Sequence, residues 1–326
     1  MRVADEGEFG LIARLRRMLA GERDGLICGI GDDTAVFRSR AGGLWAYTAD
    51  AMVEGVHFDP AYTPWHSLGY KSLAVNLSDL ASMGGSTPSY ALVVLGLRAD
   101  TEVETVEELY RGLGDCGAEF SCDVVGGDIV RSPERMFISV SLVGSIAAEA
   151  FLTRSAARPG QAVMVTGTLG DSYLGLHYLI RGMEGPSTCV QRHLYPRPRL
   201  AEGKRALELG AEAAIDVSDG LLRDLGHICE ESGVGAEIYM EKVPVSQAAV
   251  ETAQELGEDL RGAALFGGED YELILVADSD KVPAMQDELD LAVIGRITAG
   301  EGVSVLDASG KKVESGRSGY EHFKEE

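Results

Sequence analysis

The sequence predicts a two-domain protein of the α/β class, built from layers of helix and sheet. Its 326 residues correspond to about two domains at roughly 150 residues each. Expected strands and helices alternate in both halves without regular strand–helix–strand spacing, which favours α+β layers over one long parallel sheet. Apolar periodicity lapses over 144–160, so we place the domain boundary near residue 148, between domains of 1–148 and 149–326.

The elements of the N-terminal half follow from apolar spacing and from turn residues. Apolar residues recur at helical spacing over 8–20, and Gly21 provides a stop. A second helix begins after Pro64 and ends before Gly84 and Gly85. Apolar runs and alternation predict strands at 26–30, 44–48, 89–97, 123–125 and 136–143, and an acidic amphipathic helix at 102–119.

The C-terminal half shows the same alternation. Strands are expected at 162–166, 213–215, 236–240, 272–277 and 291–297. Helices are expected from about residue 172, after Pro198, and at 219–231, 246–256 and 279–289. Two short strands and a glycine-rich stretch at 315–323 form the tail.

Charge and cysteine content exclude several classes of protein. The formal net charge is −23, which disfavours binding to nucleic acid or to anionic lipid, so any phosphate must be bound locally, with divalent cations. Five scattered cysteines without a CxxC pair indicate a reducing compartment, and we expect a cytoplasmic protein. The longest apolar run, 90–97, is too short to span a membrane.

The familiar nucleotide-binding and catalytic motifs are missing. There is no GxxxxGK[ST] loop, no GxGxxG following a strand, no GxSxG, no protein-kinase signature and no HExxH. The chain instead carries aspartates, most of them beside glycines or serines, each next to an apolar run or on a helix with an apolar face. These segments are 31–33, 48–50, 76–79, 126–128, 216–220 and 267–270.

Converging carboxylates of this kind indicate a metal–phosphate site. At low dielectric they repel one another unless cations lie among them, and all-oxygen ligand sets suit Mg²⁺, above all when phosphate shares the coordination. Adjacent glycines let backbone N–H groups approach phosphate oxygens. Any one segment alone is more simply a turn, and Ser218 could be only a helix cap, so the inference depends on the six together.

The motifs resemble those of the thiamine-monophosphate kinases, a family of the aminoimidazole-ribonucleotide synthetase-like superfamily. The resemblance runs in order from residue 8 to 323, and NLSDLASMGG with GVHF and FGGEDYEL is its most particular part. The other segments that carry it are GIGDDTAVF, TADAMVEGVHF, VVGGD, LTRSAARPG, VTGTLGDS, AAIDVSDGL and GYEHF. The GDD and GGD elements alone would also suit a purine-pathway cyclo-ligase of the same superfamily.

The resemblance implies the two-domain fold of that superfamily in a homodimer, whose N-terminal domains pair into a barrel-like sheet. It implies transfer of the γ-phosphoryl group of ATP to thiamine monophosphate with several Mg²⁺ ions, ATP lying in clefts lined by both halves of the subunit. Carried over by motif, the magnesium ligands are Asp33, Thr48, Asp50, Asp79, Asp128, Asp216 and Asp219. Nucleotide contacts fall on Gly127, Asp128, Arg154 and Ser218, and acceptor contacts on His57, Asp79, Glu269 and Tyr320.

Two positions depart from the family pattern: Ala49, where a hydroxyl residue is frequent, and Arg317, near a place where an aromatic residue occurs. The chemistry suits a site without a histidine base, because a phosphate acceptor is already an anion at neutral pH and in-line transfer depends on alignment and charge neutralisation. His57 could instead be a packed strand residue. A non-enzymatic protein that buffers divalent cations is a further alternative, although EF-hand spacing is absent.

Overall fold

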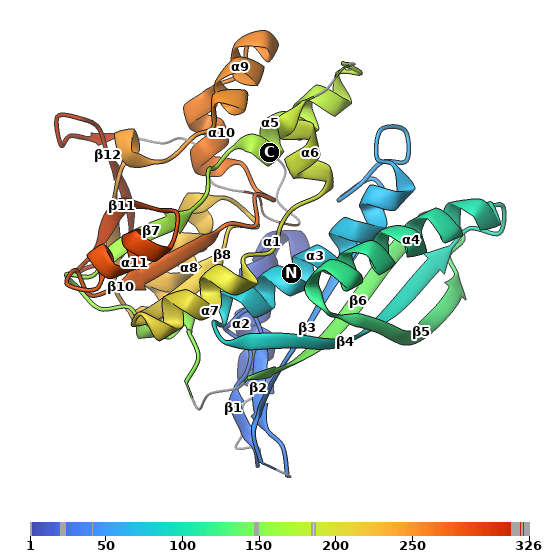
Figure 1. Cartoon of the computed structure of the whole chain (residues 1–326), viewed down its shortest axis with the longest axis horizontal. Coiled ribbons are helices and arrows are strands. Elements are labelled where there is room, and N and C mark those ends of the chain that lie inside the picture. The colour runs from blue at the N-terminus through green and yellow to red at the C-terminus, as the bar shows by residue number, and fades with distance from the viewer. Residues whose placement is uncertain are drawn as a thin grey trace.

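The structure, a computed structural model, describes residues 2–19, 24–40, 42–146, 150–183, 185, 187–313, 320 and 322. Two separate β-sheets, each with helices packed against it, account for these residues (Figure 1). This confirms the predicted α/β class with mixed layers. The expected boundary at residue 148 lies outside the described residues, as do Gly21 and Arg317. No described helix is both long enough and apolar enough to cross a membrane.

The N-terminal sheet has six strands in the order β1-β2-β3-β6-β4-β5, antiparallel except for the parallel pair β4–β5. Its strands are β1 (Leu26–Cys28), β2 (Ala35–Arg38), β3 (Leu44–Val53), β4 (Ser86–Leu97), β5 (Asp123–Arg131) and β6 (Phe137–Ile146). The predicted strands at 44–48 and 123–125 are too short, because pairing with β6 and β4 continues through polar and glycine residues. The short strand β2 was not predicted.

Helices α3 (Trp65–Ser82) and α4 (Val103–Phe120) cover one face of this sheet (Figure 1), and both helices were predicted. Two glycines let them approach closely: a Cβ at Gly69 would lie 1.9 Å from the Leu109 carbonyl oxygen, and one at Gly112 would lie 1.8 Å from that of His66. The two remaining helices of this half are α1 (Val3–Glu6) and α2 (Glu8–Met18). Helix α3 also contacts the second half of the chain, at α7 and β8, and so lies between the two sheets.

The C-terminal sheet has seven strands in the order β13-β12-β9-β11-β7-β10-β8, with only β12–β9 parallel. They are β7 (Ala162–Thr166), β8 (Ala211–Asp216), β9 (Gly235–Tyr239), β10 (Leu273–Ala277), β11 (Leu291–Thr298), β12 (Gly302–Leu306) and β13 (Lys312–Val313). The buried strands β7, β8 and β10 form the middle of a second apolar core.

The helices of this half are α5 (Asp171–Ile180), α6 (Thr188–Leu194), α7 (Leu200–Glu208), α8 (Leu221–Ser232), α9 (Gln247–Leu256), α10 (Leu260–Phe266) and α11 (Val282–Glu288). The sequence predicts five of these seven. It misses α6 and α10, which have seven residues each and are too short to show a helical period.

Candidate active site

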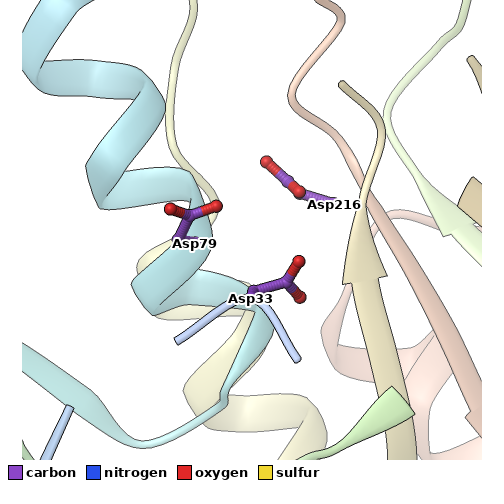
Figure 2. A group of neighbouring side chains, drawn as sticks. All are labelled: Asp33, Asp79 and Asp216. Atoms are coloured by element: carbon purple, nitrogen blue, oxygen red, sulfur yellow. The ribbon is translucent and has the colours of Figure 1, made fainter. Parts of the chain in front are cut away.

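A cluster of three carboxylates lies where the two sheets approach one another. Asp33 lies in the loop between β1 and β2, Asp79 in the last two turns of α3, and Asp216 at the end of β8. One carboxylate oxygen from each lies within 4.8 Å of the others, and Figure 2 shows the three side chains pointing toward a shared space. The sequence predicts all three as magnesium ligands.

Hydroxyl groups hold these carboxylates in place. On α3, Ser82 Oγ donates to Asp33 Oδ2 at 2.6 Å, and Ser78 Oγ donates to Asp216 Oδ2 at 2.5 Å. The Thr48 hydroxyl of β3 donates to Asp79. Residue 82 is four positions after 78 and three after 79, so its side chain lies next to both on the helix surface. One face of α3 therefore supplies a carboxylate and orients two others.

Electrostatics make this cluster costly without cations. Burial raises the pKa of Asp216 to about 8, and the charge of Asp33 adds to the effect. Burial also raises the pKa of Asp79 well above its ordinary value, with further contributions from Asp50 and Asp216. Buried carboxylates this close are stable as anions only when positive charge is shared among them. Their oxygen-only donor set fits Mg²⁺, and Thr48 lies beside it as a further oxygen.

Arg154 is a cation at the edge of this cluster. Its guanidinium pairs with Asp33, and its backbone N–H donates to Asp32 Oδ2 at 3.3 Å. Burial disfavours the guanidinium charge, but Asp33 more than offsets this and raises the pKa of Arg154. The predicted nucleotide contact therefore lies directly against a predicted metal ligand.

The loop after β8 is organised by a residue that the sequence analysis missed. The buried Asp224 carboxylate accepts three backbone N–H groups, from Ser218 at 3.0 Å and from Asp219 and Gly220 at 3.1 Å each. Asp224 lies in the first turn of α8. Acidic residues are favoured there because they stabilise the helix N-terminus, so the sequence did contain a signal for this residue. These bonds fix Ser218 and Asp219 beside the cluster. Burial raises the pKa of Asp219 to about 6.

Two predicted acceptor residues, His57 and Glu269, lie near Lys71 in the first half of α3, whereas Asp79 belongs to the carboxylate cluster. Lys71 Nζ lies 3.1 Å from Glu269 Oε1, and His193 Nδ1 lies 3.5 Å from Glu269 Oε2. His57 Nδ1 accepts the Val53 N–H at 3.1 Å, and burial lowers the pKa of this histidine. Lys71 and His193 were not predicted as site residues, because neither lies beside a glycine–aspartate segment.

The described part of the tail returns to the site. The Tyr320 N–H donates to the Asp219 carbonyl oxygen at 3.1 Å, and the Tyr320 hydroxyl lies 3.2 Å from His322 Nδ1. The His322 ring lies 5.2 Å from that of His57, centroid to centroid. Tyr320 therefore connects the loop after β8 with the acceptor end.

Two predicted nucleotide-binding residues, Asp128 and Gly127, lie apart from the carboxylate cluster. Asp128 pairs across the sheet with Val94, which pairs with Ser139 and then with Ala51, so three strand spacings, about 14 Å, separate it from β3. Its row lies on the opposite face of the sheet from Met52 and Thr48. Gly127 adjoins it, and a Cβ there would lie 1.7 Å from the Val93 carbonyl oxygen.

Ala49 lies in the exposed part of β3, on the face of the sheet opposite Thr48. Because its side chain points away from the carboxylates, the structure gives no reason for a hydroxyl residue at this position within one subunit. Asp50 keeps its backbone N–H bonded to Asn76 Oδ1 at 3.2 Å, which ties β3 to α3 at the level of the cluster.

Comparison with known families covers most of the chain. Residues 31–146 match the N-terminal domain of the AIR synthase related proteins, and residues 158–308 match their C-terminal domain. The two matched regions include the carboxylate cluster, Lys71, Asp128 and Glu269, whereas Arg154 lies in the segment between them.

Individual relatives are similar over their full length. The chain is 40% identical to a thiamine-monophosphate kinase of Aquifex aeolicus, over 99% of this chain and 100% of the relative. It is 37% identical to that of Escherichia coli strain K12, over 97% and 98%. A solved structure of AaThiL complexed with AMPPCP and TMP superposes with a TM-score of 0.87 at 39% identity, covering 99% of both chains.

Proposed function

The chain belongs to the thiamine-monophosphate kinase family of AIR synthase related proteins, and from this premise we propose its reaction in detail. The γ-phosphoryl group of ATP is transferred in line to the phosphate of thiamine monophosphate, giving thiamine diphosphate and ADP. The relative solved with AMPPCP and TMP supports these two substrates.

The observation that carries the proposal is the group Asp33, Asp79 and Asp216, with one oxygen of each within 4.8 Å. We assign these residues, with Thr48, Asp50 and Asp219, to binding of several Mg²⁺ ions. When bound, Mg²⁺ neutralises charge on the transferring phosphoryl group and on both phosphate substrates. The hydroxyls of Ser78 and Ser82 hold two of the carboxylates in position before substrate arrives.

The nucleotide end is formed by Arg154 and by the loop that carries Ser218. The Arg154 guanidinium supplies a fixed positive charge for nucleotide phosphate, and Asp33 orients it. Asp224 holds the backbone N–H groups of Ser218 and Asp219, which fixes the loop against the site. Alignment of the phosphates is thus prepared by the chain itself.

At the acceptor end, the incoming nucleophile needs no general base. A phosphate monoester is already an anion at neutral pH, whereas a free hydroxyl would need a group to accept its proton. The clustered carboxylates are engaged with hydroxyl or guanidinium groups and would be Mg²⁺ ligands when the ion is bound. We assign His57, Glu269 and Tyr320 to the body of the acceptor and Asp79 to the region of its phosphate.

The open face of the N-terminal sheet supports a homodimer. Tyr47 and Tyr90 both pair with Val143, so the three form one row across the sheet, and the tyrosines are 46% and 52% exposed. Leu92 extends this face at 47% exposure. We propose that a second copy covers these apolar residues, that the two sheets form a barrel-like structure, and that Asp128, which lies on this face, serves the nucleotide site of the partner subunit.

The test is release of ADP with thiamine monophosphate, thiamine and aminoimidazole precursors as parallel acceptors. We expect activity with thiamine monophosphate alone, and ³¹P spectra that show a new diphosphate. Comparable rates with thiamine would overturn the base-free mechanism, and activity only with an aminoimidazole precursor would assign the chain to the cyclo-ligase chemistry.

A further inference from the structure

A buried lysine lies at the acceptor end, outside the carboxylate cluster. Lys71 is only 4% exposed and lies on α3, eight residues before Asp79. Its ammonium nitrogen is 3.1 Å from Glu269 Oε1, in an ion pair rather than a well-aligned hydrogen bond. Eight residues of helix correspond to about 12 Å, so one rigid element links this ion pair to the metal-binding end.

Glu269 is held in an unusual backbone conformation. Its φ is +63° and that of Tyr271 is +51°, although neither is glycine. The Glu269 N–H donates to the Ser218 carbonyl oxygen at 2.8 Å, and the Tyr271 N–H donates to that of Val217 at 2.9 Å. Left-handed conformations are unfavourable for residues with a side chain, and they persist only where the surrounding contacts hold them.

The charges around Glu269 come from three other elements. Lys71 faces it from α3, His193 from α6, and His57 from the segment after β3; Tyr62 and Tyr271 are the neighbouring phenols. Burial would raise the pKa of Glu269, but Lys71 above all, then His193, lowers it below its ordinary value. Burial lowers the pKa of His193 to about 3, so this imidazole is neutral at pH 7. Lys71 is therefore the full positive charge that compensates Glu269.

A lysine at this place is poorly explained by stability alone. Apolar side chains of similar volume commonly stabilise a core as well as a buried ion pair does. Removing only one residue of such a pair, in contrast, leaves the charge of the other uncompensated. The strained backbone, the buried ammonium and the partly exposed Glu269 carboxylate, at 25% of its side chain, together indicate a prepared anion at the wall of the site.

We propose that Lys71 is a positioning residue, which holds the Glu269 carboxylate as an anion aimed at the cationic thiazolium ring of the acceptor. The inference rests on the proposed function, because it takes thiamine monophosphate as the acceptor. It adds a specificity element: α3 sets the separation between the cationic ring, held through Lys71 and Glu269, and the phosphate, received near Asp79.

The test is a pH series of KM for thiamine monophosphate, from about pH 6 to 8.5, in Lys71→Met and wild type. The ratio of the two KM values cancels the titration of the acceptor phosphate itself. Without Lys71 the partly buried Glu269 should take up a proton more readily, so we expect the ratio to be about tenfold or more at pH 6 and to fall as the pH rises. The KM for ATP should keep its wild-type value.

Three variants make the result specific. Lys71→Arg should restore a flat ratio, and the double variant Lys71→Met with Glu269→Gln should give a raised but flat ratio. Arg199→Met is the matched control, because it also removes the cation of a largely buried pair, with Glu272, and neither residue is assigned to the acceptor. Melting curves establish folding, and Lys71→Gln gives the same readout should the Met variant not fold.

A ratio near one, a raised ratio that does not change with pH, or an equal loss of ATP affinity would overturn the positioning role. Wild type that does not use thiamine monophosphate would instead overturn the proposed function, and the inference with it. These outcomes are distinguishable, because the second is decided by wild type alone.

Discussion

Asp216→Asn should stabilise the metal-free protein while it abolishes turnover. Burial and Asp33 raise the pKa of Asp216 from 3.8 to about 8, so at pH 7 the folded state holds a proton that the unfolded state has released. About three pH units at 1.36 kcal/mol each give an upper limit of about 4 kcal/mol. An asparagine oxygen can still accept the hydrogen bond from Ser78, so we expect a gain of about 2 kcal/mol.

The assay is thermal unfolding in EDTA at pH 4, 6 and 8. Because the pKa of Asp216 is raised in the folded state, this residue lowers the free energy of unfolding of wild type. The loss is absent below pH 3.8, grows with pH and is complete above pH 8. A gain of about 2 kcal/mol corresponds to about 3–4 °C for a chain of this size. The variant should therefore melt with wild type near pH 4 and several degrees higher at pH 8, and Mg²⁺ should stabilise wild type more than the variant.

The exposed Asp290→Asn, in the same domain, is the control for the chemical change itself and should not alter the melting temperature. An Asp216→Asn variant that melts no higher than wild type at pH 8 without divalent cations would contradict this expectation. So would a difference in melting temperature that shrinks as the pH rises, or full turnover at saturating Mg²⁺.

Three further predictions address the nucleotide loop, the dimer and the metal. Asp224→Ala leaves three backbone N–H groups without their acceptor, so KM for ATP should rise about tenfold or more with KM for thiamine monophosphate little changed; an equal change in both would contradict this. The variants Asp128→Asn and Asp79→Asn should each be inactive alone. Unfolding and refolding them together should restore about a quarter of wild-type activity, because half of the dimers are then mixed and each mixed dimer holds one intact site of two. No recovery would place Asp128 in its own subunit's site. Initial rate against free Mg²⁺ at fixed MgATP should rise with more than first-order dependence, and a simple hyperbola would contradict several ions.

The carboxylate cluster could be predicted from sequence because each member lies beside an apolar element. Asp216 follows a buried strand and Asp79 lies on a helix with an apolar face, so their positions are determined by core packing. The same reasoning located most helices and strands. Strand lengths were underestimated where Asp50 and Gly127 interrupt the apolar pattern, because pairing with a neighbouring strand outweighs local composition.

The remaining parts depend on tertiary contacts that no spacing reveals. Lys71 and Glu269 are far apart in the sequence, and their pairing follows from how α3 packs against the second half of the chain. Asp128 has the same local pattern as the clustered aspartates, yet its strand lies at the edge of the sheet, three spacings from β3. Whether an aspartate joins the cluster therefore depends on the order of the strands in the sheet, which sequence periodicity does not encode.

Helix α3 shows why the site requires both halves of the chain. It is buried along most of its length, yet it carries Lys71, Asn76, Ser78, Asp79 and Ser82, which a helical-wheel argument would place toward water. Two of these polar groups are paired across the junction, Lys71 with Glu269 and Ser78 with Asp216, whereas Ser82 donates to Asp33 within the N-terminal half. A buried polar group without a partner costs about 1–3 kcal/mol, so the same stripe that forms the site also fixes how the two sheets pack. Substitutions in this stripe should therefore alter catalysis and domain packing together, whereas changes to the apolar residues Tyr47, Tyr90 and Leu92 on the open face should act through association.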